Sequence, residues 1–430
     1  MIQEKPLAAT ELERPAVALR TLANGVRLLA LPMPHLQSVS VGVFLRVGSR
    51  DETSTSNGIS HVLEHMAFKG THTRSVQEIN LDAEQLGAEV NAFTGKDITG
   101  YFMTGLGWHA QALLGMIADI VLNSVFPEHE LQRELQVIRQ EAIEYEEDPE
   151  DSAGDLLDRA IWGDDPMGMP VIGTVANIEG FTRQDLVRHV QSHYVGEKTV
   201  VVAAGNFDVP AWLEQAAQLF AGMPASADPA VALPPQPAKY VGQALAQRFT
   251  QVSQVFVNLA YPLVFEQLQG EHPQRARLVA SLAAHLLGEG MSSPLVDTVR
   301  ERLGLAYTAY AAMEGGDVWA NFIVHAVTTP DKLEALVAAT GGLLRAQAAG
   351  IDLVHLERAK NQLAVSRVRA GERTYATMER AVEDLFAHGS VTSVAETLAM
   401  IDGIGAEEVR KVFAVSYTHL RAHETSLHLV

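Results

Sequence analysis

The clearest alternation of apolar and polar positions lies in segment 37–47. Every second position there carries a branched apolar side chain, namely Val39, Val41, Val43, Leu45 and Val47. This period of two predicts a β-strand with one buried face. A second apolar run, rich in valine, occupies 199–208 and predicts another strand near the end of the first half of the chain.

Apolar residues recur with helical spacing in three segments of the first half, 106–123, 127–147 and 210–222. The segment that follows, 223–239, is rich in Pro and Ala and has no periodic pattern. Such a composition is typical of an interdomain linker. We therefore expect a first domain over 1–222 and a second domain over 240–414.

The second half repeats the order of the first. A predicted strand over 254–263 precedes a helix over 275–288, and a long helix over 353–368 parallels the acidic helix of the first half. Segment 404–417 has the same polar and apolar spacing as segment 181–194. This agreement indicates an internal duplication.

Composition limits the classes of function. The chain has 430 residues, of which 47% are hydrophobic, which is enough for two globular domains. No run approaches the roughly 18 apolar residues of a membrane helix, and the N-terminus lacks the apolar core of a signal peptide. We therefore expect a cytoplasmic protein without membrane insertion. The net charge of -20 makes nucleic acid an unfavourable partner.

Candidate chemistry is concentrated in the stretch GISHVLEHMAFKGT, residues 58–71. On a helix, residues three and four positions apart share a face. His61 and His65 can therefore present two imidazoles to one metal ion, while Glu64 points a carboxylate at the same place. This arrangement is the outline of a hydrolytic metal site.

A catalytic zinc ion takes three protein ligands and keeps one position for water, so a third ligand must come from elsewhere. The chain has no cysteine, which excludes thiolate ligands and also disulfides. The acidic, helical segment 129–151 offers Glu134 and Glu141, seven positions apart and therefore on nearly the same helix face. One of them could ligate the metal while the other supports it.

These motifs resemble those of the inverzincins, the pitrilysin-type zinc peptidases that include the mitochondrial processing peptidase. In that family H-x-x-E-H is followed by a glutamate ligand, and Glu141, about 75 positions after His65, stands where the family has it. Glu134 matches the family's second acidic residue, which implies a role in orienting the ligands. The likeness continues through three further stretches of the first half, 68–71, 86–102 and 166–174.

The resemblance implies one Zn2+ per chain, held by His61, His65 and Glu141. Glu64 would then be the general base, taking a proton from the water that attacks a peptide carbonyl. We expect either histidine to matter for both metal binding and turnover, and Glu64 to matter for turnover alone.

Further roles are implied by other matches to the family. Arg300 and Tyr307 match a pair that the family brings over the scissile bond, where a guanidinium and a phenol can stabilise negative charge. Substrate peptides would bind as an added strand along an edge segment. That segment is matched here by Asn91, Ala92, Phe93 and Thr94.

The fold implied by the resemblance is α+β, with two similar domains that each consist of an antiparallel sheet backed by helices. Chains of this size in the family pair to enclose a chamber, so that Arg300 and Tyr307 of one chain would serve the zinc of the other. Some bacterial relatives divide the zinc site and this pair between two chains. Because this chain carries both sets, we expect a homodimer acting on peptides, with a heterodimer as the alternative.

Two other functions fit the same fold. One is a non-catalytic assembly or scaffold subunit, which the complete metal set disfavours. The other is a dedicated precursor-maturation peptidase, which sequence cannot distinguish from a general endopeptidase. The second half retains only His285 at the position of the zinc helix, so we expect it to lack a metal site. Residues 415–430 lack the apolar run that closes the first half, and we expect them to be a non-native tail.

Overall fold

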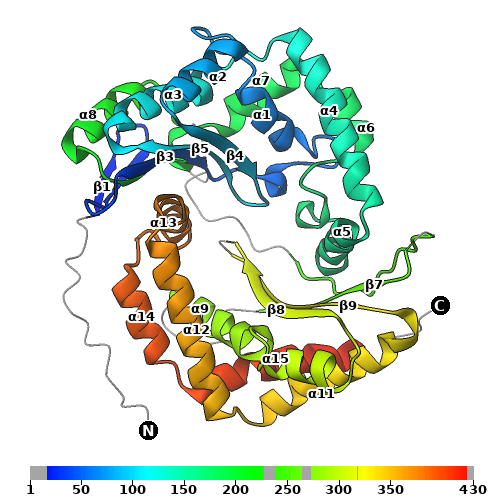
Figure 1. Ribbon diagram of the computed structural model, residues 1–430. Coiled ribbons are helices and arrows are strands. Elements are labelled where there is room, and N and C mark those ends of the chain that lie inside the picture. Colours follow the sequence, from blue (N-terminus) through cyan, green and yellow to red (C-terminus); the bar gives the residue numbers. More distant parts are fainter. Residues whose placement is uncertain (1–16, 227–238, 251, 264–272, 317, 424–430) are drawn as a thin grey trace.

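The computed structural model describes residues 17–226, 239–250, 252–263, 273–316 and 318–423, with the backbone alone for 415–423. The chain forms two halves, each a β-sheet with helices packed on it (Figure 1). The predicted fold class is thereby confirmed. Most of the expected linker and the end of the expected tail lie outside the described residues, so those two predictions stay predictions.

The first half contains a six-stranded sheet in the order β1-β2-β6-β3-β5-β4. Its strands are β1 (Ala18–Thr21), β2 (Arg27–Pro32), β3 (Ser38–Leu45), β4 (Glu89–Thr94), β5 (Thr99–Leu106) and β6 (Thr199–Gly205). The prediction of a purely antiparallel sheet is wrong at one pair, because β2 and β6 run parallel. A long connection separates these two strands in the sequence, and such connections can return a strand in either direction.

Eight helices of the first half are described. They are α1 (Ile59–Ala67), α2 (Val76–Gln85), α3 (Ala110–Asn123), α4 (Glu128–Glu147), α5 (Pro149–Trp162), α6 (Val175–Gly180), α7 (Arg183–His193) and α8 (Val209–Phe220). The predicted helix over 106–123 begins later than expected, at Ala110. The Gly107 amide donates to the Gln37 carbonyl, and the Gly107 backbone passes so close to Asn206 that a side chain would not fit. The end of β5 therefore continues through the position at which apolar spacing alone would start a helix.

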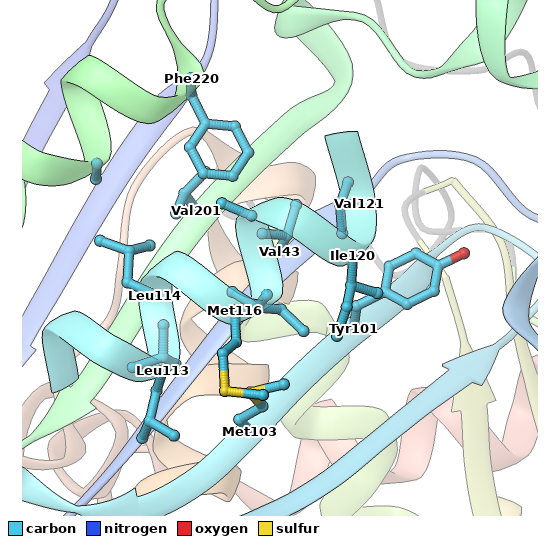
Figure 2. Close-up of a cluster of buried hydrophobic side chains, with 14 of the residues drawn as sticks. Val43, Tyr101, Met103, Leu113, Leu114, Met116, Ile120, Val121, Val201 and Phe220 are labelled. Carbon is cyan, nitrogen blue, oxygen red and sulfur yellow. The ribbon is translucent and has the colours of Figure 1, made fainter. Parts of the chain in front are cut away.

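One face of this sheet packs against α3. Figure 2 shows the resulting core, in which Leu113, Leu114 and Ile120 of the helix lie against side chains from the strands. Val43 of β3 and Tyr101 of β5 belong to this cluster and are almost fully buried. Burial of these apolar groups is the main source of stability for this layer.

The opposite face of the sheet packs against a helix from the second half, α13 (Thr374–His388). Figure 1 shows α13 lying between the two sheets. Ser40 of β3 and Thr374 at the start of α13 share a hydrogen bond of 2.8 Å between their hydroxyl groups. The two halves therefore share a core.

The described sheet of the second half has three antiparallel strands in the order β7-β9-β8. They are β7 (Val255–Pro262), β8 (Thr308–Gly315) and β9 (Ala320–Thr328). The helices packed beside them are α9 (Pro273–Gly288), α10 (Pro294–Val296), α11 (Leu333–Ala349), α12 (Leu353–Gly371), α14 (Val394–Asp402) and α15 (Ala406–His423). No helix in the described parts of the chain is long and apolar enough to cross a membrane.

Candidate metal centre

Helix α1 carries the H-x-x-E-H residues. Its apolar positions pack against α4, α6 and α7, and the cluster includes Ile59, Val62, Leu63, Met66, Leu131, Leu135 and Ile138. The helix begins after Gly58, whose φ of 99° lies in the left-handed region that favours glycine. Burial of this stripe fixes the helix so that His61 and His65 face Glu141 of α4, whereas Glu64 reaches Thr94 of β4.

Helix α4 supplies the two glutamates. An oxygen of Glu141 lies 4.0 Å from Nε2 of His61 and 3.6 Å from Nε2 of His65. The three candidate ligand atoms all lie within 4.8 Å of one another. In the described part of the chain this is the single group of at least three such residues.

Glu134 lies on the other side of His65. Its Oε2 is 3.3 Å from Nδ1 of His65, and its Oε1 is 2.7 Å from Nζ of Lys69. A carboxylate can only accept a hydrogen bond, so this contact favours the tautomer of His65 with the proton on Nδ1. The lone pair of Nε2 is then directed to the side where Glu141 lies, as an imidazole ligand requires.

His61 has a different environment. Burial, followed by the neighbouring His65, lowers the pKa of His61 to about 4. The imidazole is therefore neutral at pH 7, which is the form that binds metal. Its Nδ1 is buried and has no hydrogen-bond partner among the described residues. His61 therefore differs from His65, whose Nδ1 faces a carboxylate of the described residues.

Glu64 accepts a hydrogen bond of 2.7 Å from the hydroxyl of Thr94 on β4. Burial raises the pKa of Glu64, and the nearby Glu141 raises it further, whereas the Thr94 hydrogen bond and His65 lower it. The raised pKa makes the carboxyl group of Glu64 easier to protonate than a carboxyl group in water. A general base that later releases its proton benefits from such a pKa.

The donor set suits zinc. Two imidazole nitrogens and one carboxylate oxygen are ligands of catalytic zinc sites, and three protein ligands leave one position open. Tetrahedral ligand atoms about 2.1 Å from zinc lie about 3.4 Å apart. The observed separations to Glu141 of 3.6 and 4.0 Å come close to that value. His61, His65 and Glu141 therefore fit the ion that the sequence predicts.

The predicted substrate segment lies in β4, which pairs with β5 alone and forms one edge of the first sheet. Its side chains alternate between the two faces. Ala92 packs against the core that contains α3, and Thr94 reaches Glu64. Asn91 and Phe93, together with Ala92, line a groove of about 600 Å³ beside the N-terminus of α13. The edge of β4 next to Thr94 is thus close to the candidate base.

Arg300 and Tyr307 lie in the second half, on a π-helical turn over Asp297–Arg302 and directly before β8. The guanidinium carbon of Arg300 is 5.3 Å from the centre of the Tyr307 ring, and the Tyr307 side chain is 77% exposed. The structure thus brings this pair together. No hydrogen bond, ion pair or ring contact between described residues joins it to the metal cluster of the same chain.

Two polar residues next to the site were absent from the sequence prediction. Lys69 follows His65 by four positions, so helical spacing could have placed it beside Glu134. Glu52 lies six residues before Gly58 and binds the start of α1, a contact made through a turn that no periodicity encodes.

The fold of two helix-backed sheets, with a cluster of two histidines and a glutamate in the first half, has counterparts among known proteins. The insulinase (peptidase family M16) model matches residues 29–175, and the model of the peptidase M16 inactive domain matches residues 180–363. The chain belongs to peptidase family M16. The description of the second model agrees with a second half that has lost the metal residues.

Individual relatives support the same assignment. An uncharacterized zinc protease of Rickettsia bellii is 31% identical over 92% of this chain and 95% of its own length. The uncharacterized zinc protease YmxG of Bacillus subtilis is 30% identical over 92% of this chain and 96% of its own. A solved protease from Helicobacter pylori has a TM-score of 0.83 at 21% identity, over 93% of this chain and 96% of that one.

Proposed function

We propose that this protein is a zinc-dependent endopeptidase that hydrolyses peptides or short unfolded polypeptides. The observation that carries the proposal is the convergence of His61, His65 and Glu141 to within 4.8 Å, with Glu64 beside them. Membership of a family whose curated relatives are named zinc proteases supports it. A scaffold subunit would need no such donor set.

When bound, zinc supplies Lewis-acid activation of a water molecule and of the substrate carbonyl. The carboxylate of Glu64 accepts a proton from the attacking water and then delivers it to the departing amine nitrogen. Thr94 holds one oxygen of Glu64, so the other oxygen is left to face the reacting groups. A peptide added along the edge of β4 would bind through its backbone, which accounts for tolerance of different sequences.

The proposal is tested by peptide hydrolysis and metal content, measured on the same samples of wild-type protein and Glu64→Gln. We expect the variant to retain its zinc and to lose about 100-fold to 10,000-fold in kcat, the usual contribution of general acid–base catalysis. His61→Ala is the matched control, and it should lose both zinc and turnover. A folded wild-type protein that binds no zinc would favour the scaffold alternative.

The substrate range is tested with a panel of short, unrelated peptides. Cleavage of several peptides is the result expected for a general endopeptidase. Cleavage of none of them by a zinc-loaded protein would instead indicate a dedicated precursor-maturation peptidase. The physical reason is that backbone pairing alone does not select a sequence.

We further propose that the protein acts as a homodimer in which Arg300 and Tyr307 of one chain stabilise the oxyanion at the zinc site of the other. The exposure of Tyr307 and the lack of a described contact with the metal cluster of its own chain support this proposal. The test mixes two inactive variants, Glu64→Gln and Arg300→Ala. A mixed dimer would contain one site with both residues intact, so activity should return on mixing. Sites built within one chain would stay inactive.

A further inference from the structure

Glu52 is a buried carboxylate at the start of the helix that carries the metal residues. The residue is 3% exposed. Oε2 accepts a hydrogen bond of 2.8 Å from the Gly58 amide, and Oε1 accepts one of 2.9 Å from the Ser60 amide. The side-chain amide of Asn57 also donates to Oε2, at 3.1 Å. One carboxylate therefore binds the amide of the N-cap residue and that of the second helical residue of α1.

Helix α1 has no cap of its own. Its N-cap residue is Gly58, which has no side chain to accept a hydrogen bond from the first turn. Glu52 takes that function from outside the helix. A negative charge at a helix N-terminus is also favourable because the backbone dipoles place partial positive charge there.

Of the two candidate histidine ligands, His61 depends more on this contact than His65 does. His65 is oriented by Glu134, whereas Nδ1 of His61 has no partner among the described residues. His61 follows Ser60 directly, so its position depends on the backbone of the first turn. The rise of an α-helix is about 1.5 Å per residue, and a misplacement of about 1 Å can cost about 100-fold in rate.

A second group of contacts fixes the same turn. Gly58 lies against Gly173, and a Cβ atom on Gly173 would lie 2.5 Å from the Gly58 Cα. Asn57 also donates a hydrogen bond of 2.9 Å to the Pro170 carbonyl. Glu52 is thus the one charged member of a framework that holds the start of α1 against the segment around residue 173.

We infer that Glu52 is a positioning residue for the metal centre, which acts by fixing the first turn of α1 and through it the imidazole of His61. The inference rests on the proposed zinc site and extends it to a residue that touches neither metal nor substrate. Its failure can be separated from failure of the endopeptidase proposal because metal binding is measured apart from turnover.

The test compares zinc affinity, kcat, KM and thermal stability of Glu52→Gln with those of the wild-type protein. A glutamine has one acceptor oxygen, so at least one of the two amides loses its partner while side-chain size is kept. We expect zinc affinity to fall by about 10-fold or more, as for residues that orient ligands. We also expect kcat to fall by a similar factor with KM nearly unchanged, and the visible spectrum of the Co2+-substituted protein to change.

Asp208→Ala is the control. Asp208 caps α8, which carries no site residue, through a hydrogen bond of 3.0 Å to the Ala211 amide. This variant should lose stability without any change in zinc affinity or kcat. A Glu52→Gln variant with a lower Tm but wild-type zinc affinity and kcat would overturn the inference.

Should Glu52→Gln not fold, Glu52→Asp provides the test. It keeps the charge and shortens the side chain by one methylene, which draws the first turn of α1 out of place. Reduced zinc affinity in a folded Glu52→Asp protein supports the inference, and wild-type affinity refutes it. The zinc affinity of the variant tests the inference even if the wild-type protein cleaves no peptide.

Discussion

His189 should make the stability of this protein fall at mildly acidic pH. The residue lies on the buried side of α7 and is 8% exposed, and its Nε2 has no hydrogen-bond partner in the described chain. Burial, followed by the charges of His193 and Lys198, lowers its pKa from 6.5 to about 3. Folding therefore keeps this imidazole neutral under conditions in which the unfolded chain would protonate it.

The sign follows from proton binding. Between about pH 6.5 and pH 3 the unfolded chain holds a proton at His189 that the folded chain does not, so the free energy of unfolding decreases as the pH falls. At pH 5 the loss amounts to about 2 kcal/mol relative to pH 7. Because the folded-state pKa lies well below 5, this figure is set almost entirely by the ordinary pKa of the unfolded histidine.

The assay is urea unfolding at pH 7 and pH 5, in the presence of a chelator so that metal release makes no contribution. We expect His189→Leu to lose about 2 kcal/mol less than the wild-type protein between the two pH values, because leucine does not titrate. His129→Leu, which removes a histidine whose side chain is 73% exposed, should behave as the wild type. Equal losses in His189→Leu and the wild-type protein would refute the reasoning.

Three further changes have expected outcomes. Lys69→Met removes the cation 2.7 Å from Glu134 and should weaken zinc binding by about 10-fold in calorimetric titration. Lys69→Arg keeps the cation and should bind zinc nearly as tightly as the wild-type protein. Equal zinc affinities of Lys69→Met and the wild-type protein would contradict the role of Lys69. Trp319→Phe removes the 2.7 Å hydrogen bond that Trp319 donates to Asp97 between the halves. The free energy of unfolding in urea should decrease by about 2 kcal/mol. An unchanged unfolding midpoint would contradict this prediction. Gly173→Ala adds a methyl group to a residue with φ of 87° and should cost about 2 kcal/mol or more, so a stable variant would show that the contact is loose.

Local spacing accounts for part of the candidate metal cluster that the structure brings together. His61, Glu64 and His65 are three and four positions apart on one helix, and helical geometry alone brings them to one face. Glu134 and Glu141 are seven positions apart and therefore lie on nearly the same face of α4. The packing of α4 against α1 joins segments that are far apart in the sequence. Only the resemblance to a family predicted that these segments meet.

Other features depend on contacts that spacing does not encode. Apolar alternation predicted β3 and a valine-rich run predicted β6, but neither pattern carries information on strand direction, so the parallel pairing of β2 with β6 was missed. The late start of α3 results from backbone contacts of Gly107 with distant residues. Glu52 was missed because it caps α1 from a turn rather than from a recognisable capping motif.

The packing of α13 on the first sheet has a consequence for synthesis of the chain. This helix covers an apolar surface that includes Leu29, Leu31, Phe44, Val200 and Val202. About 170 residues separate the end of β6 from the start of α13, which corresponds to roughly 10–35 s of translation. During that interval the nascent first half has a complete sheet with one uncovered apolar face. That face stays exposed to solvent until the C-terminal half emerges, and transiently exposed apolar surface of this kind is prone to aggregation.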